Sequence, residues 1–262
     1  MNDNNLCNEV CNDFLPAFRM LAGTNLYSIT LAGSHGKGIA DKSSDFDFCL
    51  YYEKPAKMED RRIAYKEIEQ LIAKWKEKGV VVDGVWPRTY EEVEKQLDTW
   101  TSGNGEPESY MWTIWGYHFL TSIYNQQILE DTHGKVGQWK ERLSTYPEAL
   151  KDSIIKKHVN SLEYWRNDYH YRNKVQRKDV VFLASITTRL VHDMMQVIYA
   201  LNKFYYPGDG MNLKYTEQFE LKPVNFEERI TDIFRISDAE DTYEVQYVKL
   251  TGLIDEVLEL AR

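Results

Sequence analysis

Residues 33–47 of the chain read GSHGKGIADKSSDFD, so that a Gly33-Ser34 pair precedes two aspartates on either side of Phe46. Successive side chains of a strand point to opposite faces, and we therefore expect Asp45 and Asp47 on one face and Phe46 on the other. An Asp-x-Asp sequence alone is more often a solvated strand edge, but the Gly-Ser pair ahead of it makes the combination rare by chance. Paired carboxylates favour a hard cation such as Mg²⁺.

The glycine-containing turn offers groups that bind phosphate. Backbone N–H groups at Gly33 and Ser34, together with the Ser34 hydroxyl, can hold the terminal phosphates of a triphosphate. Lys37 adds positive charge to a chain that is otherwise acidic. We also assign Ser44, the residue before the first aspartate, to the nucleotide. These four residues are the predicted nucleotide-binding set.

Strands and helices alternate around this motif. Residues 26–31 and 46–52 are rich in β-branched and aromatic side chains, which predicts two strands. Apolar residues recur at helical spacing between residues 59 and 78, and residues 80–86 form a third predicted strand.

This arrangement resembles the nucleotidyltransferase superfamily related to DNA polymerase β, in which a Gly-Ser turn precedes an Asp-x-Asp strand. The resemblance implies that Asp45 and Asp47 bind two Mg²⁺ ions beside a nucleoside triphosphate. It also implies a third carboxylate on a following strand, where this chain has Asp83. Asp83 is then either a metal ligand or the general base, unless it only begins a turn before Gly84. Lys37 stands where many members carry arginine.

The chain changes character over residues 133–147, because strands and helices alternate before this segment and only helical patterns follow it. Pro147 is suited to the start of a helix. Further helical segments are predicted over residues 147–165, 179–204, 226–236 and 242–260. We therefore predict an α+β protein. A nucleotidyltransferase domain with a mixed sheet and flanking helices (residues 1–140) precedes a C-terminal α-helical bundle (residues 141–262).

Composition limits the partners. The chain has 262 residues, 43% of them hydrophobic, a net charge of −9 and a pI of about 5.3. A nucleic-acid groove needs a basic face, which the sequence lacks, so a small or cationic acceptor is expected and a nucleic acid is not. No apolar run is long enough to span a membrane, and the first residues do not resemble a signal peptide. Three cysteines, an odd number, fit the reducing cytoplasm.

The predicted reaction is in-line attack by an acceptor hydroxyl on the α-phosphorus of a nucleoside triphosphate, with release of pyrophosphate. In layout the chain is similar to bacterial antibiotic adenylyltransferases, which makes ATP the expected donor and an aminoglycoside or a lincosamide a candidate acceptor. Three other hypotheses are kept: adenylylation of a protein side chain, as in antitoxin-like members, a nucleotide-binding module without catalysis, and a scaffold protein. The sequence does not identify the acceptor or the oligomeric state.

Polar side chains also recur within the apolar helix predicted over residues 179–204. Arg189, His192, Asp193 and Gln196 are three to four residues apart and share one helix face. They are either a functional group or, alternatively, a buried hydrogen-bond network or an exposed stripe.

Overall fold

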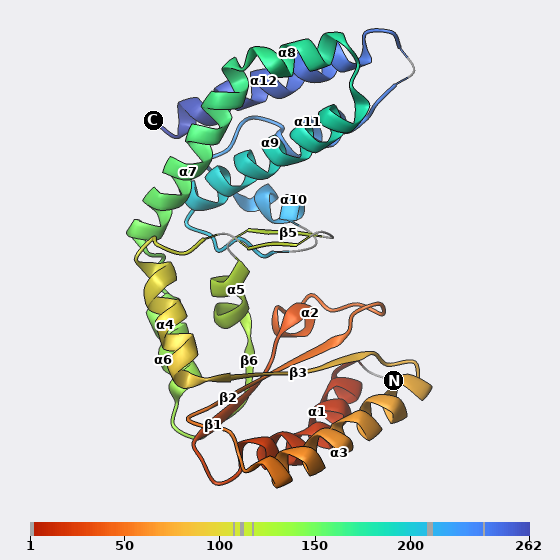
Figure 1. The fold of residues 1–262 in the computed structure, drawn as a ribbon, viewed down its shortest axis with the longest axis vertical. Helices are drawn as coiled ribbons and strands as arrows, with labels where there is room; N and C mark the ends of the chain where they lie inside the picture. Colours follow the sequence, from red (N-terminus) through yellow and green to blue (C-terminus); the bar gives the residue numbers. More distant parts are fainter. Residues whose placement is uncertain (1–2, 107, 111–112, 117, 209–211, 238) are drawn as a thin grey trace. The chain divides into compact units, whose positions relative to one another are not determined.

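The computed structural model describes residues 3–106, 108–110, 113–116, 118–208, 212–237 and 239–262 (Figure 1). The chain forms two compact units. Unit 1 comprises residues 1–98 and 122–145, and unit 2 comprises residues 99–121 and 146–262. Each unit has a hydrophobic core of its own.

Unit 1 is built on a mixed four-stranded sheet. In spatial order its strands are β3 (Val82–Thr89), β2 (Phe46–Tyr52), β1 (Tyr27–Leu31) and β6 (Gln127–Asp131). β2 runs parallel to β3 and antiparallel to β1, and β6 is antiparallel to β1. Pro87 lies in β3, which is an edge strand with a neighbour on one side only. Proline is tolerated there because the N–H that it lacks is not needed for pairing with a second strand. The predicted mixed sheet is confirmed.

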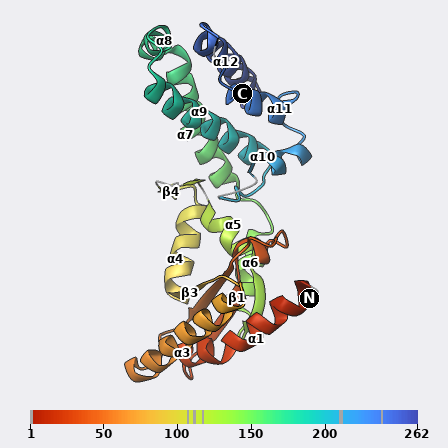
Figure 2. The ribbon, with the colours of Figure 1, turned by 90° about the vertical axis from the view of Figure 1, so that its right-hand side faces the viewer.

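Two helices cover one face of this sheet, α1 (Asp3–Ala22) and α3 (Met58–Glu77), which pack against each other. Figures 1 and 2 show both helices on the same side of the strands. Every second residue of β2, beginning with Phe46, points into this layer and is buried. The ring of Phe48 lies 5.6 Å from that of Phe14 and 5.0 Å from that of Phe18, which ties α1 to the centre of the sheet.

The opposite face of the sheet, which we call the polar face, buries hydrogen-bonding side chains together with aromatic ones. The side chain of Gln126 accepts from Thr30 Oγ1 at 2.6 Å and exchanges hydrogen bonds with Tyr51 Oη. The Trp139 ring meets Tyr51 edge-on at 5.2 Å and Tyr90 at 5.8 Å. Trp139 belongs to α6 (Lys135–Leu143) and Tyr90 to α4 (Tyr90–Thr101), so these helices reach this face.

The start of α4 is fixed by a reciprocal capping box. Thr89 Oγ1 accepts from Glu92 N at 3.2 Å, and Glu92 Oε2 accepts from Thr89 N at 2.7 Å. Two short elements precede the last strand of the sheet along the chain: the β4–β5 pair (Glu108–Tyr110 and Thr113–Gly116) and α5 (His118–Asn125).

Unit 2 is mainly helical. After residue 145 its helices are α7 (Glu148–Asn167), α8 (Tyr169–Gln176), α9 (Val180–Leu201), α10 (Asn212–Tyr215), the 3₁₀ turn η1 (Thr216–Gln218), α11 (Phe226–Ile233) and α12 (Thr242–Leu260). α9 is buried over most of its length and packs against α7 and α12. Asp179 caps α9 by accepting from Phe182 N. With the mixed sheet of unit 1, this confirms the predicted α+β class.

The division into two domains, residues 1–140 and 141–262, is a statement about parts that fold independently, and it stays a prediction. Within the part of the chain that the structure describes, no helix has both the length and the apolar character needed to cross a membrane.

Two isoleucines of α3 test the helix–sheet layer of unit 1. Ile68 is 4% exposed and Ile63 is 59% exposed. We expect Ile68→Ala to lower the free energy of unfolding by about 2–5 kcal/mol, because it leaves a cavity under the sheet. Ile63→Ala, the matched control, should change it by about 0.5 kcal/mol or less. Urea denaturation measures both, and equal effects would show that α3 does not pack on the sheet as described.

Candidate functional site

The Gly-Ser turn forms α2 (Gly33–Gly36), a single helical turn directly after β1 (Figure 1). Ala32 N donates to Asp47 O at 2.8 Å, so the start of the turn is tied to β2. Gly33 has a φ of +57°, and a Cβ atom built there would collide with Asp47 Oδ2. The Asp47 carboxylate therefore rests on the bare Cα of Gly33, which explains why glycine precedes the serine.

Ser34 and His35 bring further polar atoms to the turn. Ser34 Oγ is buried and has no hydrogen-bond partner in the protein, and the same holds for His35 Nε2. The His35 ring stacks on Phe46 at 3.9 Å and 22°. Burial lowers the pKa of His35 below its usual value, and the Asp45 carboxylate opposes that shift. His35 was not among the predicted site residues.

The two other predicted nucleotide-binding residues lie on either side of the loop between α2 and β2. Lys37 is the C-cap residue of α2 and is half-buried. Ser44 Oγ accepts from Asp41 N at 2.8 Å and donates to Asp41 Oδ1 at 3.3 Å. The Ser44 hydroxyl thus closes a turn within the loop, whereas the Ser34 hydroxyl is left for another group.

Asp83 lies in a β-bulge of β3. Phe46 is opposite Val82 and Asp47 is opposite Gly84, so Asp83 is an extra residue in the ladder. Gly84 has a φ of +113°, which residues with side chains rarely adopt. The predicted third strand is present as β3, which pairs with β2, and the alternative that Asp83 only begins a turn is wrong, because β3 continues to Thr89.

Val82 points into the apolar core beside Phe46, whereas Asp83 is exposed. Among the residues that the structure describes, no three His, Cys, Asp or Glu side chains are grouped so that they could hold a metal ion. Asp45 and Asp47 are two residues apart in the sequence, and the bulge leaves Asp83 between Val82 and Gly84, the partners of Phe46 and Asp47. The assignment of all three as metal ligands stays a prediction.

The chemistry of these groups nevertheless suits a phosphate with a hard cation. The donor set is made of carboxylate oxygens, which Mg²⁺ prefers. Ser34 Oγ, a buried donor without a partner, can be satisfied by a phosphate oxygen.

Comparison with known families agrees with this chemistry. Residues 11–102 match the family model of the nucleotidyltransferase domain. The chain carries a nucleotidyltransferase domain. Residues 112–210 match a second family, described as a domain of unknown function (DUF4037). No curated protein sequence is significantly similar to the chain.

One similar solved structure is a nucleotidyltransferase-like protein from Exiguobacterium sibiricum 255-15. It has 8% sequence identity and a TM-score of 0.47, over 91% of this chain and 70% of its own. A likeness at this level supports no conclusion about the site.

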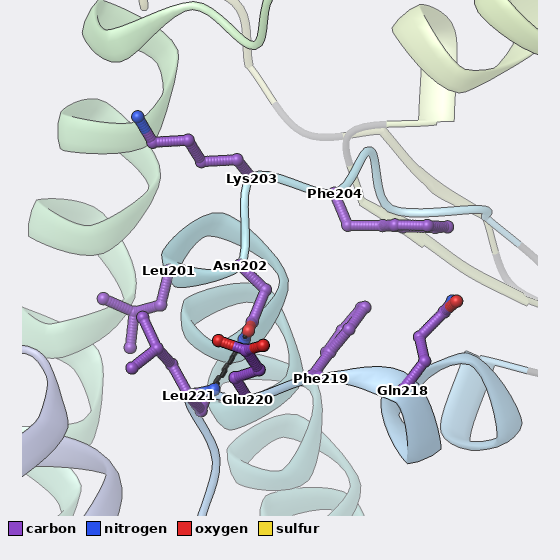
Figure 3. A pocket seen from close by; sticks show the side chains of 8 residues that line it. All are labelled: Leu201, Asn202, Lys203, Phe204, Gln218, Phe219, Glu220 and Leu221. Carbon is purple, nitrogen blue, oxygen red and sulfur yellow. Dashed lines mark hydrogen bonds between the residues drawn. The ribbon is translucent and has the colours of Figure 1, made fainter.

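Unit 2 holds a separate surface pocket of about 450 Å³ (Figure 3). It is lined by Leu201, Asn202, Lys203, Phe204, Gln218, Phe219, Glu220 and Leu221. The rings of Phe204 and Phe219 are 5.4 Å apart. Asn202 joins the two sides, since its amide donates to Leu221 O at 2.9 Å and its carbonyl oxygen accepts from Leu221 N at 3.0 Å. Asn202 therefore holds the end of α9 to the following loop.

Two glycines of the nucleotidyltransferase domain separate backbone strain from the contact with Asp47. Gly33 and Gly38 both have positive φ, +57° and +69°, but a Cβ at Gly38 would meet nothing within 4 Å. Either alanine variant should cost about 1–2 kcal/mol of stability through the left-handed backbone. Only Gly33→Ala should also displace the Asp47 carboxylate and weaken binding of Mg²⁺ and ATP, measured by calorimetry. Equal nucleotide affinity in the two variants would contradict the role of this contact.

Proposed function

We propose that the chain transfers a nucleoside monophosphate, AMP from ATP, onto a hydroxyl of a small molecule. The observation that carries the proposal is the Gly33–Ser34 turn of the nucleotidyltransferase domain. There a buried serine hydroxyl without a partner lies next to a carboxylate seated on glycine. Phosphate oxygens can accept from the hydroxyl, and the carboxylate would hold a cation that offsets the phosphate charge.

In the proposed reaction the acceptor oxygen forms a bond to the α-phosphorus, and the bond between that phosphorus and the α,β-bridging oxygen breaks. Pyrophosphate leaves with the electron pair of that bond, and the hydroxyl proton passes to a base. Ser34 Oγ and the backbone of the turn hold the phosphates in place, so that the attacking oxygen and the leaving group stay in line.

Asp45 and Asp47 are the residues that would hold Mg²⁺, two ions in our proposal, with Asp83 as the third carboxylate. Bound Mg²⁺ supplies positive charge that offsets the negative charge developing on the transferred group. Asp83 has two candidate roles, as a ligand or as the base that takes the hydroxyl proton.

The direct experiment measures pyrophosphate release from ATP, GTP, CTP and UTP with Mg²⁺ over a panel of acceptors. The panel includes kanamycin, lincomycin and a neutral sugar. Transfer to one of these molecules, with AMP found on the acceptor by mass spectrometry, is the expected result. Mg²⁺-dependent binding of ATP without any turnover would show a binding module instead. AMP found on a protein side chain would favour the protein-modifying alternative.

Two Asp→Asn variants test the metal-binding carboxylates, with a third as control. Asp45→Asn and Asp47→Asn should lower transfer by about two orders of magnitude or more, because a neutral amide loses most of the attraction for Mg²⁺. Asp41→Asn is the control, because Asp41 lies in the same loop and its carboxylate accepts hydrogen bonds from Ser43 N and Ser44 Oγ. Its turnover should stay near that of the wild type, and an equal loss in all variants would contradict the assignment.

Asp83→Asn separates the two roles of the third carboxylate. If Asp83 is a ligand, the Mg²⁺ concentration for half-maximal rate should rise. If it is the base, kcat should fall while the affinity for ATP is kept. Unchanged kinetics in Asp83→Asn would remove this residue from the site.

Two serines distinguish the phosphate turn from the loop that follows it. Ser34→Ala should weaken ATP binding by about tenfold or more, since a hydrogen bond to a charged phosphate contributes about 1.5–3 kcal/mol. Ser44→Ala should leave the affinity nearly unchanged, because the Ser44 hydroxyl is engaged with Asp41. Calorimetry with ATP and Mg²⁺ gives both values. A larger effect at Ser44 would return that residue to the nucleotide site.

A further inference from the structure

A buried polar cluster joins α7 and α9 within unit 2. His158 of α7 and Asp193 of α9 are each only 4% exposed. The carboxylate cannot donate, so His158 Nδ1 donates to Asp193 Oδ1, at 2.6 Å. Ser161 Oγ donates to Asp193 Oδ2 at 2.7 Å. The Arg189 guanidinium, one turn earlier on α9, has its Nε 4.0 Å from the same carboxylate oxygen.

Two further residues of α9 face the same side, His192 and Gln196. The His192 ring lies 5.8 Å from that of His158 and 5.8 Å from that of Tyr206, edge-on to both. Burial, followed by the charge of His158, lowers the pKa of His192 to about 4, so the imidazole is neutral at pH 7. Its buried Nδ1 has no hydrogen-bond partner in the protein.

Gln196 is the least satisfied member of the cluster. Gln196 is only 1% exposed, and neither its amide oxygen nor its amide nitrogen has a hydrogen-bond partner in the protein. An apolar residue of similar size would fill the same space without burying unpaired polar atoms. The fold of the bundle therefore gives no reason for an amide at this position.

We propose that this cluster recognises an uncharged hydroxyl group of the acceptor, with Gln196 as its main contact. The inference rests on the proposed function, because it identifies what unit 2 contributes to substrate choice. A hydroxyl both donates and accepts, so one such group can satisfy the amide oxygen and the amide nitrogen of Gln196, or either of them together with His192 Nδ1.

The charges of the cluster favour an uncharged group over an ammonium group. The Asp193 carboxylate is already paired with His158 and Ser161 and has Arg189 beside it. His192 is neutral, and Gln196 carries no charge. A cation placed here would find no uncompensated carboxylate, and burial would cost it more than it costs a hydroxyl.

The experiment compares Gln196→Met with Gln246→Met, a matched control in the same unit. Gln246 of α12 is 8% exposed, but its amide donates to Ile233 O at 2.9 Å. The probes are kanamycin, lincomycin and methyl α-glucoside, which all carry hydroxyls, and 1,4-diaminobutane, a cation without hydroxyls. Binding is measured by calorimetry, and the melting temperature is measured without probe.

We expect at least one hydroxyl-bearing probe to bind the wild type, to bind Gln196→Met about tenfold more weakly, and to bind Gln246→Met unchanged. Diaminobutane should not bind. Without probe, Gln196→Met should melt no lower than the wild type, because it loses no protein hydrogen bond, whereas Gln246→Met should melt lower.

Three binding results would overturn the proposal: no binding of any hydroxyl-bearing probe, equal affinity of wild type and Gln196→Met for the probes, or binding of diaminobutane comparable to that of the other probes. A lower melting temperature for Gln196→Met would also overturn it, because it would indicate that a structural water pairs with the amide. Affinity for ATP with Mg²⁺ should be the same in all three proteins. A wild type that binds no ATP would instead contradict the proposed function, independently of the Gln196 result.

Discussion

The contact between the Asp47 carboxylate and the bare Cα of Gly33 is the constraint on which the candidate site depends. Any side chain at position 33 would occupy the space of the carboxylate, so the turn can approach β2 closely only through glycine. The hydrogen bond from Ala32 N to Asp47 O holds the same two segments together through the backbone. Because β1 and β2 are paired neighbours, the turn and the aspartates share one rigid support. The sheet thus positions the functional groups.

Buried polar atoms differ in their hydrogen bonding between two regions of the sheet. On the covered part of the polar face, Gln126 is satisfied by Thr30 and Tyr51, so burial costs little and the network rigidifies the layer. At the end of the sheet, Ser34 Oγ is equally buried but has no partner. Ser34 Oγ is therefore the buried group that a phosphate would satisfy in the proposed function.

Much of the fold and of the motif was predictable from the sequence, because the strong signals there are local. β2 and α12 match their predicted ranges, since periodicity and flanking turns fix them. α1 was missed because Pro16 lies inside it, and burial of the surrounding apolar face overrides that penalty. α4 was also missed, although its capping box at Thr89 is a readable signal. The bulge at Asp83 and the stacking of His35 depend on contacts between distant segments, which no local pattern encodes.

The polar cluster of unit 2 extends the same reasoning to the family of unknown function that residues 112–210 match. His158 and Asp193 satisfy each other by a hydrogen bond, and such a buried pair can be retained for specificity of packing alone. Gln196 differs, because two polar atoms at 1% exposure gain nothing from the surrounding side chains. Natural sequences break local rules of this kind mainly where a ligand repays the cost. A hydroxyl that enters the cluster pairs those atoms without adding charge, so the energy lost in folding around Gln196 is recovered only when an acceptor is bound.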